Sequence, residues 1–350
     1  MNRELLLLGL TILAFILTYC LVMEVFTRWF GEPNNTIGCL GSDDTRGVRG
    51  DSRMKFPDEA TKSAAVQADH AKAFELAEQM LDYWVALSKG ALTDSTLPAH
   101  AVELALIMDI QAIRQFRTAL EECKRCEASC AAIIARSLFE TAMALMFVLK
   151  TDVRIKLVAD VKNGNTKYRA QPSKDEADLL SVETRANLYL LHVAYDSRRM
   201  LEKFANVSKK TGGDVAAPLD PENEAAITRR EVSLPLGWAD TLKQKKKYSG
   251  LRIDELAGAL DDGFALWYEA VYGDQCRIVH GSDALQHADE DGEQIVPLFH
   301  SPSEDVGRVL MVSLFLFRVC VSTLEEYVGF GPDVKAAVER FGTRYDELYS

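Results

Sequence analysis

The stretch 129–150 reads SCAAIIARSLFETAMALMFVLK, and it decides the fold. Its length and its lack of Pro and Gly predict a helix of about six turns. Between Cys130 and Leu149 its only polar side chains are Arg136, Ser137, Glu140 and Thr141. A helix that is apolar on every side is usually buried on every side. We therefore expect this helix to be enclosed by other elements of a helical domain.

Arg136 and Glu140 are the exceptions on this helix. They are four residues apart and share one face with Ile133, Met143 and Phe147. A Glu and an Arg on such a face are costly unless they pair and find further hydrogen bonds. Two interpretations follow: a structural buried ion pair, or the floor of a pocket in which Arg136 faces an anion or the acidic group of a partner.

Composition excludes several classes of protein. Hydrophobic residues make up 48% of the 350 residues and charged residues 26%, which is the balance of a packed globular protein and not of a disordered or collagen-like chain. Lys and Arg number 40 against 52 Asp and Glu, so the formal net charge is −12. A chain of that sign has no general attraction for phosphate backbones, and we expect no nucleic-acid partner from charge alone.

The N-terminus carries the signal of a membrane segment. Residues 5–23, LLLLGLTILAFILTYCLVM, contain neither a charge nor a Pro. Nineteen residues rise about 28 Å along a helix, close to the thickness of a hydrocarbon core. The apolar run is longer than that of a signal peptide, and no small-residue cleavage site follows it. We predict that residues 1–26 are a single-pass transmembrane anchor that binds the membrane through 5–23.

The anchor is followed by a polar segment and then by the body. Residues 27–62 lack periodicity and are rich in Gly and polar residues, so they predict a flexible stalk. Residues 63–348 form the predicted helical bundle domain. Arginines are more frequent after the span than before it, which favours a cytoplasmic body, and the scattered cysteines agree.

Helical periodicity continues nearly everywhere after residue 60. The expected helices are 60–89, 98–126, 129–150, 173–207, 252–279, 303–328 and 332–347, with short helices after 150 and from 221. Pro98 opens the second, and a capping box of Ser173 and Glu176 opens the long fourth one. Asn163-Gly164 is expected to end the short helix after 150, and we expect no strand there. The apolar run 309–317 is too short to span a bilayer and predicts a buried core helix. The fold class is therefore all-α, a multi-helix bundle preceded by a single N-terminal transmembrane helix.

A second polar set lies in the aromatic segment 264–281. Tyr272, Cys276 and His280 are spaced by four and fall on one helical face. His280 falls in the last turn of the expected helix, where it would cap the C-terminus and interact favourably with the negative end of the helix dipole. Alternatively, Tyr272 and His280 form a hydrogen-bonded pair that faces Arg136 and Glu140. These four residues are our candidate pocket; catalytic residues are unknown.

Metal and cofactor signals are weak. His280, Asp283, His287, Asp289 and Asp291 fit no ligand spacing, and Cys123, Cys126 and Cys130 follow one helical face instead of two paired turns. We expect no metal and no cofactor. Lys243, Lys245, Lys246 and Lys247 form a basic patch that predicts a solvated loop, with an RNA or anionic lipid contact as the alternative.

Three short motifs resemble a mostly bacterial, all-helical family known as a domain of unknown function. They are ARSLFE at 135–140, Tyr248-Ser249-Gly250 ahead of a helix, and Tyr272 followed by His280-Gly281-Ser282. The resemblance covers about 70–325 and implies the fold and the position of the site, but no activity. The family often has Ser shortly after the Tyr, where this chain has Gln275 and Cys276, and this puts hydroxyl-based chemistry in doubt.

A looser resemblance is to the helical HEPN nucleases, which use an Arg and a His separated by four to six residues. Arg185 and His192 have six residues between them and share a helical face.

The sequence as a whole leaves two expected functions. The first is a membrane-anchored binding or sensing protein whose protein or small-molecule partner is unknown. The alternative is a ribonuclease-like or other hydrolytic effector, for instance in phage defence. Whether the chain is an enzyme is left open by the sequence.

Overall fold

A computed structural model describes residues 59–87, 95–162, 165–211, 221–244, 248–260, 262–273, 288–291, 294–297 and 301–350. The chain divides into two units, Met1–Phe56 and Pro57–Ser350, and every described residue belongs to the second. The predicted anchor at 1–26 and most of the predicted stalk at 27–62 therefore lie outside the described residues. Residues 59–62 begin the first described helix.

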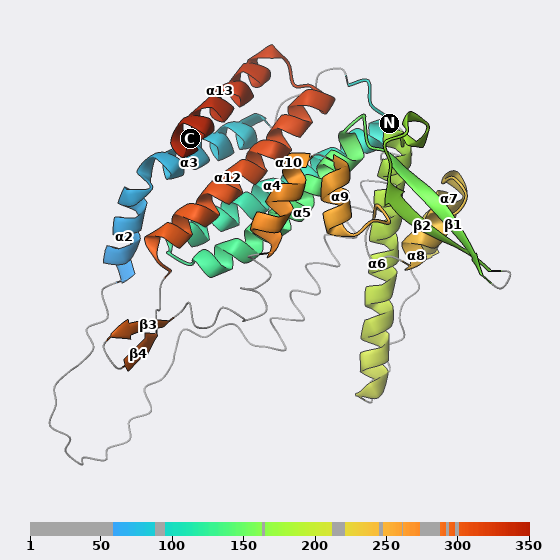
Figure 1. Ribbon diagram of the computed structural model, residues 1–350, viewed down its shortest axis with the longest axis horizontal. Helices are drawn as coiled ribbons and strands as arrows, with labels where there is room; N and C mark the ends of the chain where they lie inside the picture. Colours follow the sequence, from blue (N-terminus) through green and yellow to red (C-terminus); the bar gives the residue numbers. More distant parts are fainter. Residues whose placement is uncertain are drawn as a thin grey trace. The chain divides into compact units, whose positions relative to one another are not determined.

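The described part of the chain is mostly helical, as predicted (Figure 1). The helices before the long connection after residue 211 are α2 (Glu59–Asp69), α3 (Ala71–Leu87), α4 (Ala99–Lys124), α5 (Ala128–Leu149), the 3₁₀ turn η1 (Glu176–Asp178) and α6 (Val182–Lys210). Those after it are α7 (Pro221–Ser233), α8 (Trp238–Gln244), α9 (Ile253–Leu260), α10 (Asp262–Trp267), the π-helical turn η2 (Tyr268–Gly273), α12 (Ser303–Val328) and α13 (Pro332–Tyr349). Two antiparallel hairpins complete the set: β1 (Ile155–Lys162) with β2 (Asn165–Pro172), and β3 (Ala288–Asp291) with β4 (Gln294–Pro297).

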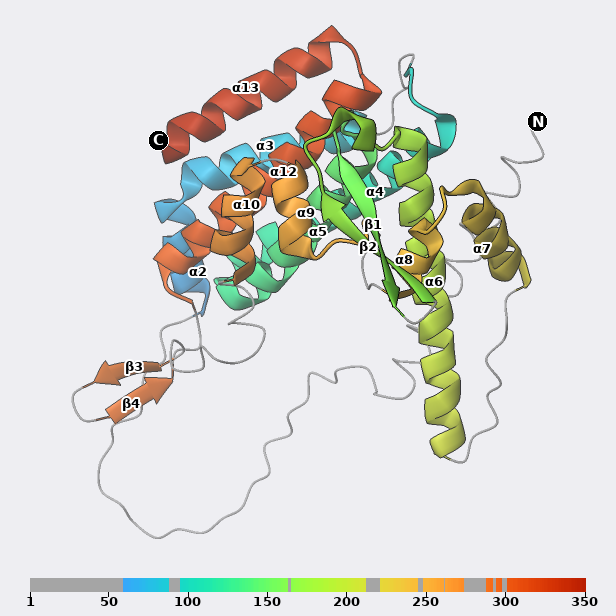
Figure 2. The ribbon, with the colours of Figure 1, turned by 45° about the vertical axis from the view of Figure 1, so that its right-hand side comes forward.

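The C-terminal half of helix α5 is enclosed by its neighbours, as its sequence predicts, whereas Cys130, Ile133 and Ser137 in its first half are exposed. Every residue from Thr141 to Leu149 is buried. Helices α4, α6, α9 and α12 all contact it. The four helices α3, α4, α5 and α12 run close together in both views (Figures 1 and 2). The aromatic rings of Phe116 on α4 and Phe317 on α12 stack at a centroid distance of 4.3 Å, so the core is continuous between these helices.

Two described helices are long and apolar enough to cross a membrane by length and composition alone. They are α5 and α12, but 72% and 61% of their most apolar windows are buried inside the body. That degree of burial is typical of core helices. The expectation that 309–317 belongs to a buried core helix is therefore consistent with the packing of α12, whose residues Leu310, Leu314 and Phe317 are completely buried.

The segment after α5 corrects one prediction. Residues 155–172 form the β1–β2 hairpin, with Ile155 opposite Pro172 and Lys162 opposite Asn165, instead of a short helix ended by Asn163-Gly164. The register leaves two residues between the paired ends, which is the loop length that an Asn-Gly pair favours most. The hairpin signal was present in the sequence and outweighs the weak helical pattern.

Three helix boundaries also differ from the prediction. The expected helix 60–89 breaks at His70, whose ring nitrogen lies 2.9 Å from the Ser303 carbonyl oxygen. The expected helix 252–279 is divided into α9, α10 and η2, and its last residues lie outside the described part. The long helix α6 is capped by Ser181, whose hydroxyl accepts a hydrogen bond from the Thr184 amide at 3.1 Å.

The predicted capping box at Ser173 is therefore wrong, and the preceding strand explains why. The hydroxyl of Ser173 donates to Asp178 and does not cap a helix. Leu179 forms a β-bridge with Arg154, and the Leu180 amide donates to the Val153 carbonyl at 3.1 Å. These contacts hold the chain extended up to Ser181, so α6 begins only there.

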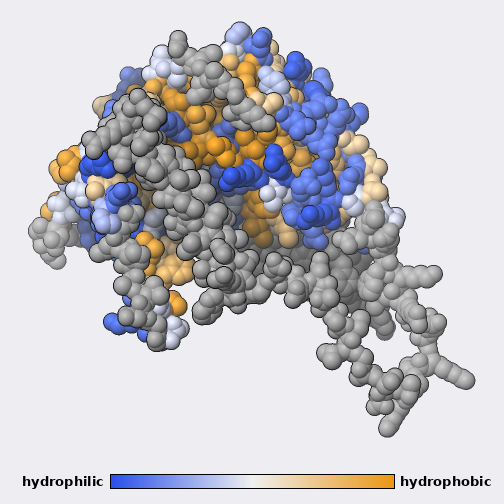
Figure 3. Space-filling model, turned by 180° about the vertical axis from the view of Figure 1, so that it is seen from behind, coloured by the Kyte–Doolittle hydropathy of each residue, from blue (hydrophilic) through white to orange (hydrophobic). Residues whose placement is uncertain are grey.

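Apolar residues also gather on the surface behind the bundle. Figure 3 shows them over the middle of that face, bordered by polar residues. Ile107 and Ile110 on α4 are 45% and 50% exposed. Apolar atoms contribute more than half of the exposed surface of folded proteins, so exposed residues of this kind are normal.

A buried carboxyl group links α3 to α4 and makes stability depend on pH. Asp109 is 3% exposed and accepts a 2.7 Å hydrogen bond from the indole nitrogen of Trp84. Burial raises the pKa of Asp109 to about 6, although the hydrogen bond from Trp84 opposes the rise. The folded state therefore binds this proton more tightly than the unfolded state, and stability falls as pH rises through about 6.

We predict that Asp109→Asn stabilises the protein at neutral and alkaline pH. Asn keeps an acceptor oxygen for Trp84 but has no charge to desolvate, so the gain in unfolding free energy should be about 1–3 kcal/mol near pH 8 and should vanish near pH 4. Urea unfolding across that pH range measures it. An unchanged pH profile in the variant would contradict this account of Asp109.

Candidate functional site

The two charges of α5 lie on the same side of the helix, as their spacing predicts. Arg136 and Glu140 are both half-buried, and neither side chain is without a partner. The neighbouring ring of Phe139 is completely buried against Phe264 of α10, with centroids 5.5 Å apart. Its ring also lies 6.4 Å from that of Tyr268. The ARSLFE segment therefore packs against the helical turns that lead toward Tyr272.

The turn Tyr248-Ser249-Gly250 is built to bury its tyrosine. The hydroxyl of Ser249 accepts a hydrogen bond from the Leu251 amide at 3.2 Å, which closes the turn. Gly250 has a φ of +68°, and a Cβ there would overlap Thr241 and crowd Ala170. Only glycine fits this position without strain. The turn therefore requires both Ser249 and Gly250, and it holds Tyr248 in a fixed orientation.

Tyr248 packs into a group of aromatic rings between α5 and α6. Its ring centroid lies 5.2 Å from Phe147, 5.0 Å from Tyr189 and 5.9 Å from His192. Tyr248 is only 6% exposed. We call Glu140, Phe147, Tyr189, His192 and Tyr248 the tyrosine cluster.

Glu140 acts electrostatically on both tyrosines of this cluster. Burial raises the pKa of Tyr189 to about 12, and the charge of Glu140 adds to the rise. Burial also raises the pKa of Tyr248 well above its usual value, with further contributions from Tyr189 and Glu140. Both phenols therefore stay protonated at neutral pH and can act as hydrogen-bond donors.

The Tyr248 hydroxyl is the unusual atom of the tyrosine cluster. It is buried, and it has no hydrogen-bond partner within the part of the chain that the structure describes. Buried polar groups in native proteins are nearly always paired. A buried donor of this kind is therefore available to an acceptor atom from a ligand.

His192 adds a group that can exchange protons. It is 8% exposed, and its Nε2 lies 3.2 Å from the carboxylate of Asp196, one turn further along α6. Asp196 also pairs with Arg199 at 2.9 Å. A His that an Asp holds in one orientation can act as a general base. The same His–Asp pair can equally have a structural role.

Arg185, the partner of His192 in the nuclease-like pair, has a structural position. Its side chain is completely buried, and its guanidinium donates to the carbonyl oxygens of Leu180, Val148 and Lys150. The last two oxygens lie at the C-terminal end of α5, where the carbonyls have no intrahelical partner. Arg185 therefore caps α5. Burial lowers its pKa to about 10, so it remains charged at neutral pH.

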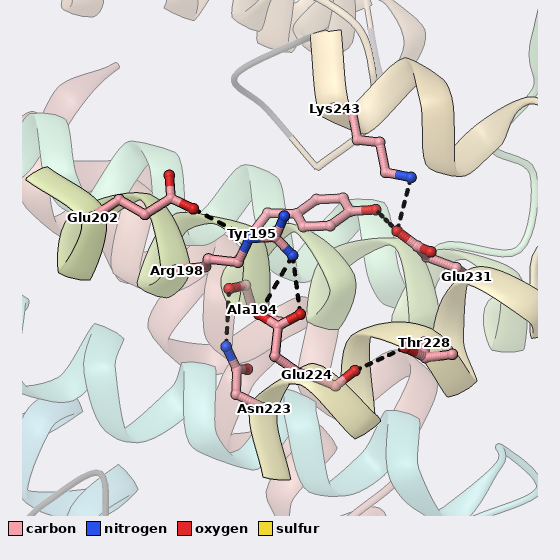
Figure 4. Close-up of polar contacts among 9 residues, drawn as sticks. All are labelled: Ala194, Tyr195, Arg198, Glu202, Asn223, Glu224, Thr228, Glu231 and Lys243. Atoms are coloured by element: carbon pink, nitrogen blue, oxygen red, sulfur yellow. Dashed lines mark hydrogen bonds and ion pairs between the residues drawn. The ribbon is translucent and has the colours of Figure 1, made fainter. Parts of the chain in front are cut away.

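A polar network fixes the elements that precede Tyr248 (Figure 4). The Tyr195 hydroxyl donates to Glu231, and Lys243 pairs with the same carboxylate at 3.0 Å. Arg198 pairs with Glu224 at 3.2 Å. These contacts join α6, α7 and α8. Lys243 of the predicted basic patch is thus engaged, whereas residues 245–247 lie outside the described part.

The structure brings together only part of the candidate pocket. Arg136 and Glu140 are on one face of α5, whereas His280 and the side chain of Tyr272 lie outside the described residues. Phe147 was placed on the face of Arg136 and Glu140 from the sequence, whereas Tyr189 was missed, because nothing in its local pattern distinguishes it from core residues. Among the described residues no three His, Cys, Asp or Glu side chains are grouped to hold a metal ion.

Comparison of the sequence with models of protein families gives a match. A family model described as "Family of unknown function (DUF5677)" matches residues 104–295, more than half of the 350-residue chain. The match includes α5, the turn at Tyr248 and the whole tyrosine cluster. No curated protein and no solved structure matches the chain.

We predict that Arg185 is needed for stability. Arg185→Met removes the donor to three buried carbonyls while keeping a similar length, and the variant should lose about 2–4 kcal/mol of unfolding free energy. Arg229→Met, at an exposed position of α7, is the matched control and should change stability little. Chemical denaturation measures both. A fully stable Arg185→Met protein would mean that capping of α5 is not the function of this side chain.

Proposed function

The chain belongs to this family of unknown function, and from the geometry of the tyrosine cluster we propose that it is a membrane-tethered binding or sensing protein. The ligand is a small polar molecule that accepts a hydrogen bond from Tyr248 and lies next to Glu140. The tether is the apolar segment 5–23, and the body is cytoplasmic.

The observation that carries the proposal is the buried Tyr248 hydroxyl. Leaving such a group unpaired costs about 1–3 kcal/mol. The hydroxyl is nevertheless held in place by the Ser249 turn, by Gly250 and by the aromatic contacts of its ring. A ligand acceptor would satisfy this donor. Aromatic walls with a few well-placed polar groups are the usual composition of small-molecule sites.

The aromatic cluster favours binding over chemistry. Arg185 is completely buried and both of its terminal nitrogens donate to carbonyl oxygens, so its side chain is not exposed to a phosphate group from solvent. One feature supports the hydrolytic alternative: His192, oriented by Asp196, lies with its ring next to that of Tyr248. This alternative also needs a catalytic cation, and Arg136 of the candidate pocket is the residue we propose for it.

Membrane tethering rests on the sequence. Residues 5–23 have the length and composition of a transmembrane helix, and the polar segment behind them would let the body move near the surface. A ligand-binding domain held in this way can report on a soluble molecule at the membrane. The arginines that follow the span support a cytoplasmic body.

The test compares ligand binding with RNA cleavage, using the body from residue 57 to residue 350. The body is incubated with panels of amino acids, polyamines, nucleotides and sugars, and its melting temperature is measured. A ligand at a hundred times its dissociation constant stabilises the native state by about 2.7 kcal/mol, which is a rise of a few degrees. We expect such a rise for one chemical class.

Variants decide whether the rise comes from the proposed site. Glu140→Gln should abolish it relative to the variant's own melting temperature without ligand, whereas Ser137→Ala, one turn away on an exposed position of α5, should retain it. A panel without any shift, together with RNA cleavage that His192→Ala removes, would contradict the binding proposal and support the nuclease-like effector.

A further inference from the structure

Helix α6 carries an exposed apolar stripe that runs from its middle to its C-terminal end. Val193, Met200, Phe204 and Val207 are 38%, 58%, 57% and 58% exposed. At about 100° per residue these four positions fall within roughly 60° of one another on the helix surface. We call them the α6 stripe. Their regular spacing distinguishes them from the scattered apolar residues elsewhere on the surface.

The charge around the α6 stripe is opposite in sign to that of the whole chain. Residues 193–211 contain five basic residues and two acidic ones, so five positive charges minus two give a local charge of +3. The basic residues are Arg198, Arg199, Lys203, Lys209 and Lys210, and the acidic ones are Asp196, which pairs with Arg199, and Glu202. The chain as a whole carries −12. Helical geometry places Lys203 and Lys210 beside the stripe and Glu202 on the opposite side.

The stripe is also accessible. The polar contacts of α6 to α7 and α8 involve residues up to Arg199, such as Arg198 with Glu224 and Arg199 with the Leu242 carbonyl. Beyond that point α6 extends past the other helices, as Figures 1 and 2 show.

We propose that the α6 stripe rests on a bilayer surface that contains anionic lipids. Phe204, Met200 and Val207 enter the interface between headgroups and acyl chains, and Lys203 and Lys210 bind lipid phosphates with their stems along the apolar boundary. This inference rests on the proposed membrane tether in one respect. A tethered body is held at high effective concentration near the bilayer, so a weak surface contact is sufficient.

A second copy of the chain is the other possible occupant. Four side chains of one helix are far fewer than the roughly 20–30 residues per side of a stable protein interface. The excess of lysines over acidic residues would also be present on both copies, so their two faces would repel each other. The local charge and the small area therefore favour a lipid surface.

The contact is tested with the body alone, because the described core lies entirely within residues 57–350. The body is sedimented with vesicles of phosphatidylcholine alone or of phosphatidylcholine with phosphatidylserine. We expect binding to the mixed vesicles, weak binding to phosphatidylcholine, and a decrease as salt is added.

Matched variants separate the stripe from general surface effects. Phe204→Glu, and the double variant Lys203→Glu/Lys210→Glu, should each lower the partition coefficient about tenfold or more. Leu266→Glu, at an exposed apolar position of α10, and Lys174→Glu, at an exposed position before η1, should leave it within about twofold. Melting curves verify that all variants are folded.

Three outcomes would overturn the proposal. They are no binding of the wild-type body to mixed vesicles, an equal loss in the control variants, or a concentration-dependent dimer that Phe204→Glu dissociates without any vesicle binding. The tether is tested separately on the full chain by carbonate washing of membranes. A chain that washes off, combined with a body that binds vesicles, would refute the tether and leave the α6 contact standing.

Discussion

The capping of α5 inside the core is the interaction on which the rest of the structure depends. The C-terminal half of α5, from Thr141 to Leu149, is buried on every side, so its last carbonyls end in the interior and cannot be hydrated. Arg185 supplies the missing donors from the first turn of α6. Lys150, at the end of α5, donates in turn to the Leu260 carbonyl at the end of α9. These two cations bring α6 and α9 to the same end of α5.

The tyrosine cluster follows from that arrangement. With α6 attached at the end of α5, Tyr189 and His192 lie along the half of α5 that contains Phe147. The turn between α8 and α9 then closes over them and inserts Tyr248. Burial is the main cause of the raised pKa of both tyrosines, and Glu140 lies near enough to raise it further. A structural requirement of the core thus creates a place where a carboxylate, a histidine and an unpaired phenol are held together.

The sequence predicted those elements whose signals are local. The central position of α5 could be inferred from its composition, and the start of α4 from Pro98. The β1–β2 hairpin was missed although Asn163-Gly164 is a strong turn signal, because the flanking residues do not alternate clearly. The start of α6 was misplaced because contacts with Val153 and Arg154 keep the chain extended to Ser181. The capping by Arg185 joins residues 37 positions apart, which no local pattern reveals.

The central claim is that Tyr248 is positioned for a ligand and not for the stability of the fold. The direct measurement is the unfolding free energy of Tyr248→Phe without ligand. Because Phe keeps the aromatic contacts and removes an unpaired buried hydroxyl, the account predicts a variant that is as stable as the wild type or up to about 1 kcal/mol more stable. A loss of 2 kcal/mol or more, roughly the effect of breaking a buried hydrogen bond, would show that the hydroxyl belongs to the structure and would contradict the account.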